Sequence, residues 1–488
     1  MIMRMHLLRK IFLLCAVAIF VGCSGVPQGT GPGPGGQNAT LTVTMTSKPN
    51  ISLANVSILS AAVSVTGVTL NPSSGSPVSL TLNPTVLPVD LTRLQSDSAL
   101  LGTLSLPAQT YSSATVTFSA PVVTVDNQSG ATLNGTCASG TICQIVLAAG
   151  TSTINTAPFP LTLASAQVAG VSINVDLSTA LTLASDTVAL NFSAINAATA
   201  TTLPRSGTAS GTLDLIEDLV GKVTAVSSNA VTVLSSSGVS QSFAFSGTPV
   251  VEDPQGLCTA LNATCLVANQ TVVSVDAAVN TDGSLTLNSV DLLDAGPQDE
   301  LEGTLLRTAT PGQFFLVVAN KIVASGNSTL AAAVPGDIFL VTLGNASFIV
   351  DTDEFFNNAS LPSSTVNNLF TSEADLLDGQ DVMVHVTAAA GSAATNDQSA
   401  TTDRVRLRFT RTTGTVQSVS GQAVTLATVP PFIPLLTNPQ AETINNATNF
   451  EGVTDANSLA FGQAVSIRAL LLNNSTFNFY AAKVRVQP

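Results

Sequence analysis

Apolar and hydroxyl-bearing residues alternate along short stretches of this chain from residue 40 onward. The alternation is clearest at 41–45, 63–66, 78–82, 115–118, 122–125, 171–175 and 188–192. Because successive side chains of a strand point to opposite faces, a period of two predicts half-buried strands, and the intervening Asn-Pro and Ser-Gly pairs predict turns. Residues 40–205 are therefore expected to form an antiparallel β-sandwich with one solvent-facing side per sheet. The one helical stretch expected is short and lies around residues 94–101.

A repeat follows the sandwich. Similar segments open each unit at 221–226, 303–306 and 414–419. A second set, beginning with Asn-Gln or Gly-Gln, lies at 269–275, 379–384 and 462–467. The second opening interval is longer than the first, so the middle unit carries an insertion. Glycines at strand starts and tight turns are what a small closed barrel needs to curl its sheet. We predict three small β-barrels, each with its own core, over residues 206–300, 301–410 and 411–488.

The first 39 residues lack this alternation. Residues 1–22 combine three basic side chains with an uncharged apolar run over 11–21, which is too short to cross a bilayer as a helix and has the length of a signal-peptide core. The closing Phe-Val-Gly-Cys resembles a bacterial lipoprotein signal, which implies lipidation and a membrane anchor at Cys23. Residues 23–39 are rich in Gly and Pro and are predicted to be a flexible tether. Ser24 resembles the outer-membrane sorting pattern, so the expected location is the bacterial cell envelope, at the outer membrane.

Charge is scarce and mostly negative. Charged residues make up 9% of the chain, so hydroxyl and amide side chains must cover most of the surface. Without the predicted leader, 13 basic and 30 acidic residues remain, a net charge of −17. Such a chain lacks the basic surface that neutralises phosphates, which excludes nucleic acid as a partner. The 45% hydrophobic content, rich in Val, Leu and Ile, predicts packed cores.

Four of the six cysteines form two close pairs, Cys137 with Cys143 and Cys258 with Cys265. Neither pair has a neighbouring histidine, and the spacing is not that of a zinc knuckle. Because an exported chain meets an oxidising compartment, each pair is predicted to form a loop disulfide, which would contribute about 2 kcal/mol. The alternative is two pairs of free thiols.

Part of the sandwich region resembles a known family. The resemblance rests on Asp90-Leu91, Leu100–Gly102, the corner Leu106–Tyr111, Thr115-Val116, Val175–Leu177 and Leu203-Pro204. These segments resemble bacterial lipoprotein domains of unknown function with a transthyretin-like or carboxypeptidase-regulatory-like sandwich. Gln109 stands where the family corner has glycine. The resemblance implies a buried packing role for Tyr111 and brings no activity with it. The repeat resembles a second bacterial family of unknown function, a short β-barrel module found in tandem.

Catalytic side chains are few. Outside the predicted leader the one histidine is His385, which lies in an alternating strand and has no Gly-x-Ser-x-Gly elbow to serve. Paired carboxylates remain candidates for glycoside hydrolysis, at Glu252-Asp253, at Asp299-Glu300, and at Asp351 with Asp353-Glu354. The chain has no Trp and only two Tyr, however, so it lacks the aromatic platforms typical of sugar clefts. No cofactor is predicted.

A calcium site is the one metal candidate. Asp351, Asp353 and Glu354 could supply carboxylate oxygens, although the spacing is not that of an EF-hand loop and a solvated turn would have the same composition. Together these patterns predict a membrane-anchored envelope lipoprotein that acts as a non-enzymatic structural or binding module. Its partner would be an envelope protein or a glycan. The alternatives are a glycan-active enzyme or accessory domain using paired carboxylates, and a calcium-stabilised adhesin.

Overall fold

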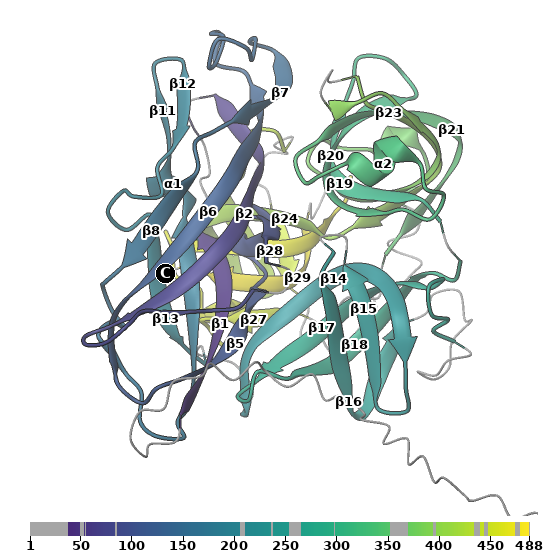
Figure 1. Cartoon of the computed structure of the whole chain (residues 1–488). Coiled ribbons are helices and arrows are strands. Elements are labelled where there is room, and N and C mark those ends of the chain that lie inside the picture. The colour runs from purple at the N-terminus through teal and green to yellow at the C-terminus, as the bar shows by residue number, and fades with distance from the viewer. Residues whose placement is uncertain are drawn as a thin grey trace, which may run out of the picture. The chain divides into compact units, whose positions relative to one another are not determined.

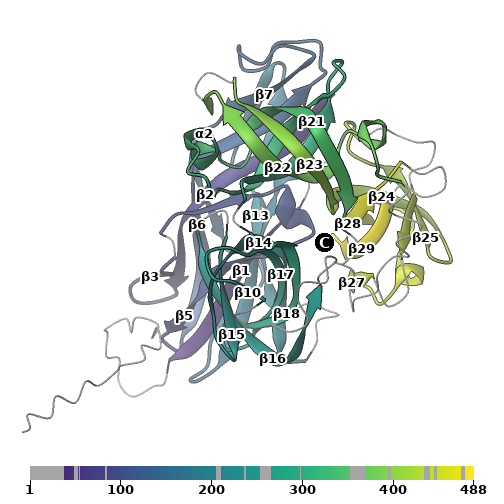
Figure 2. The same ribbon diagram turned by 90° about the vertical axis from the view of Figure 1, so that its right-hand side faces the viewer.

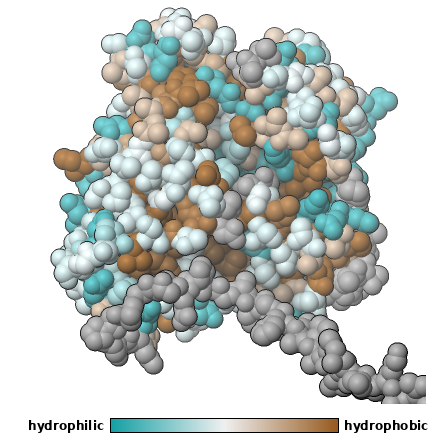
Figure 3. Space-filling model, in the orientation of Figure 1, coloured by the Kyte–Doolittle hydropathy of each residue, from teal (hydrophilic) through white to brown (hydrophobic). Residues whose placement is uncertain are grey.

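The computed structural model describes most of the chain after residue 37. The described residues are 38–48, 53, 55–82, 85–204, 210–235, 238–252, 265–296, 298–351, 369–393, 397–433, 440–443, 448–473 and 479–487. They form an all-β protein, which confirms the predicted fold class (Figure 1). Figure 3 shows, on one face, a mostly weakly polar surface with apolar and hydrophilic residues scattered through it, as the scarcity of charge requires.

The first module is a sandwich of two main sheets. One sheet has the order β13-β10-β1-β5, with β1 (Ala39–Lys48), β5 (Ala99–Leu106), β10 (Val168–Asp176) and β13 (Ala198–Leu203). The other contains β2 (Val56–Pro72), β3 (Val78–Ser79), β4 (Leu87–Asp90), β6 (Thr110–Asn127), β7 (Thr141–Val146), β8 (Gly150–Ile154) and β9 (Leu161–Thr162). The hairpin of β11 (Leu181–Ala184) and β12 (Thr187–Leu190) forms a separate two-stranded sheet. One pairing departs from the prediction of an antiparallel sandwich, because β1 and β10 run parallel.

Helical structure in the sandwich is shorter than expected. A single 3-10 turn, η1, covers Arg93–Gln95, and β5 already begins at Ala99. A second short helix, α1 (Leu177–Ala180), is capped by Asp176, whose side chain accepts hydrogen bonds from the amides of Ser178 and Thr179. Over the part of the chain that is described, no helix combines the length and the apolar character needed to cross a membrane.

The sandwich core holds its aromatic residues between the sheets. Phe118 and Phe192 stack with ring centroids 4.1 Å apart. Tyr111 is fully buried, and its hydroxyl donates to the carbonyl oxygen of Pro107 at 2.9 Å. This bond closes the corner before β6, so Gln109 is compatible with the turn despite replacing the expected glycine. At the far end of β6, Cys137 and Cys143 form a disulfide.

Three barrels follow, and they share one strand order. The first contains β14 (Thr212–Val226), β15 (Ala230–Ser235), β16 (Ser240–Glu252), β17 (Val272–Asn280) and β18 (Leu285–Asp294). The second contains β19 (Glu300–Arg307), β20 (Gln313–Ile322), β21 (Ile338–Val350), β22 (Asp381–Ala390) and β23 (Ser399–Arg408), with α2 (Ser328–Ala332) and η3 (Glu373–Asp375). The third contains β24 (Thr410–Ser420), β25 (Ala423–Thr428), β26 (Gln440–Thr443), β27 (Asn449–Glu451), β28 (Ala464–Leu471) and β29 (Phe479–Val486), with η5 (Ala456–Ser458).

In every barrel the third strand pairs in parallel with the last, and the last pairs with the one before it. The first two close as β14-β15-β16-β18-β17 and β19-β20-β21-β23-β22. The third repeats these pairings, since β26 pairs with both β25 and β29, and β27 adds to β29. Figure 2 shows the β14–β18 and β19–β23 barrels as curled sheets. The connectivity is that of a five-stranded Greek-key barrel.

The repeated opening glycine is required where neighbouring strands approach closely. A Cβ atom on Gly303 would lie 2.0 Å from the carbonyl oxygen of Val317 on the next strand. At Gly221 it would lie 2.6 Å from the carbonyl oxygen of Leu234, and at Gly414 2.6 Å from that of Thr428. The repeat found in the sequence therefore marks the same tight strand crossing in each barrel.

The turn before the fourth strand of each barrel also repeats. Its left-handed residues are Asn269, Gly379 and Gly462, with φ of 63°, 88° and 79°. Their amides donate to the carbonyl oxygens of Val223, Leu305 and Val416. Asn is among the few residues besides Gly that adopt this conformation readily, which explains why it can replace glycine in the first barrel.

The first barrel differs from the others by one residue in this turn. In the later barrels, Oε1 of Gln380 and of Gln463 accepts from a backbone amide of the preceding loop at 2.8 and 2.9 Å. In the first barrel, Thr271 Oγ1 accepts the corresponding bond at 2.8 Å. Thr271, not Gln270, is thus the counterpart of the two glutamines, and the alignment of the sequence repeat is shifted by one position there.

The barrels do not bury only their own cores. Val220, Val272 and Leu293 of the first barrel form one apolar cluster with Ile322 and Met383 of the second. Tyr480 and neighbouring residues of the third barrel belong to the apolar cluster of the second. In addition to the clusters inside the barrels, the outer faces of the barrels therefore carry apolar area that is buried against a neighbouring barrel.

Candidate functional site

The link between the second and third barrels carries two arginines into the interior. Arg408 ends β23 with no exposed surface, and Arg411 lies three residues later in β24. Val405, Leu407 and Phe409 alternate with the arginines and fill the barrel interior. On the other face of β23, the side chains of Arg406 and Arg408 are buried as well. Alternation thus indicates which residues point inward but not what covers the opposite face.

Arg408 joins carboxylates from two barrels. Its guanidinium donates to Asp218 of the first barrel and to Asp351 at the end of β21. A longer bond of 3.4 Å reaches Asp291 on β18. Asp218 has a φ of 54° at a bulge in β14, and such bulges commonly re-aim a side chain.

Arg411 adds a carboxylate from the sandwich. Its Nε donates to Asp97 Oδ2 at 2.6 Å, and its terminal nitrogens contact Asp218 and Asp381. Asp218 therefore bridges Arg408 and Arg411. Through these two arginines the sandwich and all three barrels share one set of ion pairs.

Arg93, in the η1 turn of the sandwich, completes the set. It donates to Asp381 Oδ2 and Glu302 Oε1 of the second barrel, each at 2.8 Å. Asn320 holds the second oxygen of Glu302 at 2.7 Å. We call the group the ionic junction; its members are Arg93, Asp97, Asp218, Asp291, Glu302, Asp351, Asp381, Arg408 and Arg411.

Burial and charge act in opposite directions on the acids of the junction. Burial alone would raise the pKa of Asp218, but the guanidiniums of Arg408 and Arg411 outweigh it, and the pKa lies far below its usual value. Burial raises the pKa of Asp381 to about 6, with the nearby Glu302 carboxylate adding to the rise against Arg93 and Arg411. The junction thus contains one firmly ionised acid and one that titrates close to neutral pH.

A second buried group ties the third barrel to the first. The Lys483 ammonium contacts Glu217 of β14 and, at 2.9 Å, Glu451 of β27. Arg485 pairs with Glu451 and donates to the carbonyl oxygen of Asp97 at 2.9 Å. Burial would raise the pKa of Glu451, but Arg485 and Lys483 lower it well below its usual range.

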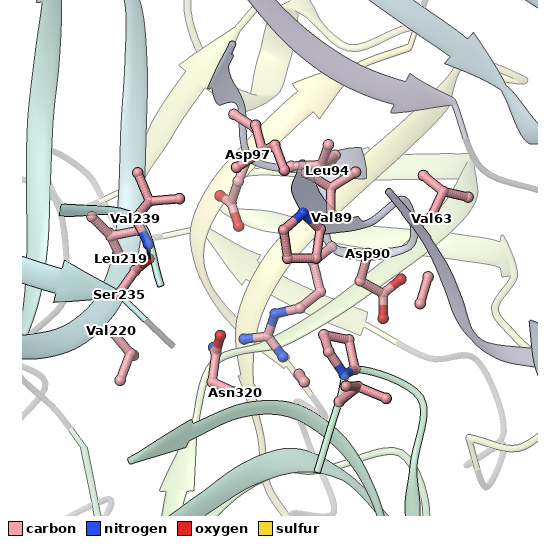
Figure 4. Close-up of a pocket in the computed structure, with 18 of the residues that line it drawn as sticks. Val63, Val89, Asp90, Leu94, Asp97, Leu219, Val220, Ser235, Val239 and Asn320 are labelled. Atoms are coloured by element: carbon pink, nitrogen blue, oxygen red, sulfur yellow. Dashed lines mark hydrogen bonds between the residues drawn. The ribbon is translucent and has the colours of Figure 1, made fainter. Parts of the chain in front are cut away.

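A cavity of about 560 Å³ opens beside the ionic junction. Its walls come from the sandwich, from β14 and the β15–β16 region of the first barrel, and from β20 and the loop after α2 in the second. Figure 4 shows Val63, Val89 and Leu94 across from Leu219 and Val220. Arg93, Asp97, Asp218 and Arg411 line it as well. The cavity has the size and the largely apolar lining of a small-molecule site.

Of the residues predicted to bind a metal or to carry a lipid, only Asp351 is among the described residues. Asp351 faces Arg408 and belongs to the ionic junction, whereas Asp353 and Glu354 lie outside the described residues. Cys23, with the whole of the predicted leader and the tether up to residue 37, also lies outside them. Within the described residues, no group of three or more His, Cys, Asp or Glu side chains is arranged to hold a metal ion.

The second cysteine pair is described only in part. Cys265 is disulfide-bonded and packs against the core of the first barrel. Cys258, its predicted partner, lies outside the described residues. The pairing of these two residues therefore stays a prediction.

The candidate acid–base residues are held by structural contacts where they are described. Asp299 accepts from the amides of Ala324 and Ser325 at 2.6 and 2.9 Å, and Glu300 pairs with Arg404 at 2.6 Å. Asp253 and the side chain of Glu252 lie outside the described part of the chain.

His385 is on β22, where its Nδ1 lies 2.6 Å from Asp403 Oδ1. The imidazole is a quarter exposed, and a cross-strand carboxylate is its bonding partner. This arrangement fits a histidine at a strand surface.

Sequence reasoning missed the ionic junction, although a signal was present. In a chain with 9% charged residues, Arg404, Arg406, Arg408 and Arg411 fall within eight positions. Such a local concentration of guanidinium groups requires acidic partners if it is buried. The partners are distant in sequence, as shown by the 190 residues between Asp218 and Arg408. Local patterns could have indicated the arginines but not which acids they meet.

Comparisons with known proteins give two family matches. Residues 38–201 match a domain of unknown function, DUF4382, and residues 413–485 match another, DUF5666. No curated protein matches the chain. Among solved structures, "drosophila Unr CSD456" is 10% identical over 56% of this chain and 97% of its own, with a TM-score of 0.12. A multidomain protein with nucleic acid binding domains from Streptococcus pneumoniae is 11% identical over 56% of this chain and 73% of its own, with a TM-score of 0.11.

Proposed function

We propose that this chain is a membrane-anchored envelope lipoprotein that acts as a non-enzymatic binding module. The leader-like residues 1–22 and the lipoprotein-like sequence that ends at Cys23 support the anchor. The Gly- and Pro-rich segment 23–39 would hold the folded modules away from the lipid headgroups. A lipidated cysteine with two or three acyl chains meets the requirement for stable membrane attachment.

The observation that carries the proposal is the ionic junction. Arg408, Arg411 and Arg93 tie the sandwich and the three barrels into one set of buried contacts. Buried charges are costly unless they are paired, so separating the modules would expose unpaired groups in each of them. Modules locked in this way offer a preformed surface and cavity, which favours binding over a mechanism that needs domain movement.

The distribution of acid–base groups supports a role without catalysis. Asp299, Glu300 and His385 each engage neighbouring backbone or charged groups that fix them in place. A glycoside hydrolase needs one carboxyl group free to donate a proton and another positioned opposite it. We therefore expect a panel of glycan substrates to show no turnover with the full chain. Turnover that is lost in Glu252→Gln or Asp353→Asn would contradict the non-enzymatic role.

The anchor is tested by Cys23→Ser. The parent, expressed with a labelled fatty acid, should incorporate label and fractionate with membranes, because acylation at Cys23 supplies the attachment. The variant should lose both. Cys15→Ser, which changes a cysteine within the same leader, is the matched control and should behave like the parent. Label and membrane fractionation retained in Cys23→Ser would overturn the assignment.

A further inference from the structure

The cavity beside the ionic junction has a composition that restricts its ligand. Most of its wall is apolar, with Val63, Val89 and Leu94 from the sandwich and Leu219 and Val220 from the first barrel (Figure 4). A volume of about 560 Å³ accommodates a small organic molecule but not a folded chain. Burying an apolar body here would remove nonpolar surface of both partners from water.

The basic residues of the lining are already occupied. Arg93 donates to Asp381 and Glu302, and Arg411 donates to Asp97, Asp218 and Asp381. Each guanidinium thus has carboxylate partners inside the protein. An anionic ligand would have to compete with these buried ion pairs, and displacing one would leave a carboxylate unpaired.

Lys321 is the remaining basic residue of the lining. Its ammonium donates to the carbonyl oxygens of Ala331 and Ala333 at the C-terminal end of α2, which uses two of its three donors. Burial lowers the pKa of Lys321. This residue therefore has one donor left for a ligand.

The acidic residues of the lining differ from one another. Asp97 pairs with Arg411, Asp218 with Arg408 and Glu217 with Lys483. Among the described residues, Asp90 forms no ion pair. Asp90 therefore leaves an uncompensated negative charge in the wall of the cavity.

The hydrogen bonds of Asp90 all fall on one oxygen. Its Oδ1 accepts from the amide of Ala61 at 3.0 Å, and from the amide and hydroxyl of Thr92 at 2.9 and 2.7 Å. The second oxygen, Oδ2, has no hydrogen-bond partner among the described residues. The residue is 9% exposed and lies beside Val63 and Val89 in the cavity wall (Figure 4). A carboxylate oxygen without a protein partner in the wall of a cavity is a site for a hydrogen-bond donor carrying positive charge.

We propose that the cavity binds an amphipathic organic amine, with its ammonium group on Asp90 Oδ2 and its apolar body between the sandwich and the first barrel. The net charge of −14 favours the approach of a cation to this protein over that of an anion. The inference rests on the proposed role as a binding module, but it is independent of the lipid at Cys23.

Three ligands of equal chain length test the charge preference. Decylamine, 1-decanol and decanoic acid are titrated below their micellar concentrations at pH 7 into the full chain carrying Cys23→Ser, and binding is followed by calorimetry. That substitution prevents acylation and so removes the need for detergent. Decylamine should bind at least tenfold more tightly than decanoic acid, with 1-decanol between them. Equal binding of amine and acid, tighter binding of the acid, or no binding of the amine would overturn the proposal.

Asp90→Asn isolates the role of the carboxylate. Asparagine keeps an oxygen for the three bonds to Ala61 and Thr92 but removes the charge. Decylamine affinity should fall about tenfold, and the amine should lose its advantage over the alcohol. Asp126→Asn, on β6 outside the cavity lining, is the matched control and should change neither affinity. Unchanged decylamine binding in Asp90→Asn would contradict the placement of the ammonium group.

Leu219→Trp tests the location independently, because the larger side chain would occupy the apolar part of the cavity. Binding of the amine and the alcohol should both weaken at least tenfold. Retained binding of both would place the ligand elsewhere. Failure of these three tests would leave the anchor and the absence of turnover standing, since neither is measured by ligand affinity.

Discussion

The interiors of the barrels and the ionic junction between them are built on opposite principles. The second barrel fills its interior with Leu305, Phe314, Leu316 and Phe339, all buried and all contributed by its own strands. The junction holds guanidinium and carboxylate groups drawn from the sandwich and three barrels. In the described part of the chain, the barrel interiors recur three times with the same strand order, whereas the junction occurs once. Local alternation is sufficient to specify the barrel interiors, whereas only the assembled fold specifies the ionic junction.

Removing Arg408 should break the junction while leaving the barrel interiors intact. Arg408→Ala leaves Asp351 without its guanidinium partner, whereas Asp218 keeps Arg411, and an uncompensated buried charge costs about 3–5 kcal/mol. Urea unfolding monitored by circular dichroism should show a loss of that size. Arg307→Ala removes a half-exposed arginine paired with Asp378 at 3.4 Å and should cost no more than about 1 kcal/mol. Equal effects of the two substitutions would show that the junction contributes no more than a surface pair.

Gly303→Ala tests the repeated part of the fold instead, at the strand crossing of the second barrel. The new Cβ would lie 2.0 Å from the carbonyl oxygen of Val317, so β19 and β20 must move apart where the barrel closes. We expect a destabilisation near the upper end of the ~1–3 kcal/mol typical of overpacking, measured by thermal or urea unfolding. Gly296→Ala is the control, since a Cβ there meets nothing within 4 Å. A Gly303→Ala protein as stable as the control would contradict the crossing-point role of the repeated glycine.

The acids of the junction should give stability an unusual pH dependence. Asp381 has a folded-state pKa of about 6 against 3.8 in its unperturbed state, so between these values the folded chain binds a proton that the unfolded chain has lost. Stability therefore falls as pH rises from about 4 to about 6, by roughly 2 kcal/mol for this group. Burial raises the pKa of Asp276 to about 6 as well, which adds to the same trend. The lowered pKa of Asp218 affects stability only at lower pH, where stability falls as the pH falls.

Asp381→Asn measures this contribution. The decrease in unfolding free energy between pH 4 and pH 6.5 should become smaller in the variant without vanishing, because Asp276 still titrates. The apolar side chains of the barrel interiors do not titrate, so they contribute no pH dependence to stability. A variant whose pH profile parallels that of the parent would show that Asp381 does not titrate in this window.

The contrast also explains how much of the molecule could be predicted from sequence. The period of two along residues 41–45 or 405–409 indicates strands because it reflects geometry within one strand. The opening glycines predict barrels because each marks a contact with the next strand along the chain. The junction depends on pairs such as Arg411 with Asp97, 314 residues apart, which no local pattern encodes. In the sequence, Asp90 stands out only through a family resemblance, since its unpartnered oxygen is visible only once the walls of the cavity are assembled.

The smallest predicted effect concerns the one barrel turn that departs from glycine. Asn269 adopts a φ of 63° where Gly379 and Gly462 have 88° and 79°. Asn269→Gly should change the free energy of unfolding by no more than about 0.5 kcal/mol, because asparagine already tolerates this conformation and glycine gains entropy when unfolded. Asn269→Ala should cost about 1 kcal/mol, since alanine must carry a Cβ into the left-handed region without asparagine's local hydrogen bonding. Urea unfolding of both variants beside the parent measures the difference. An Asn269→Ala protein as stable as Asn269→Gly would mean that this turn is not held in the left-handed conformation, and that the first barrel closes differently from the other two.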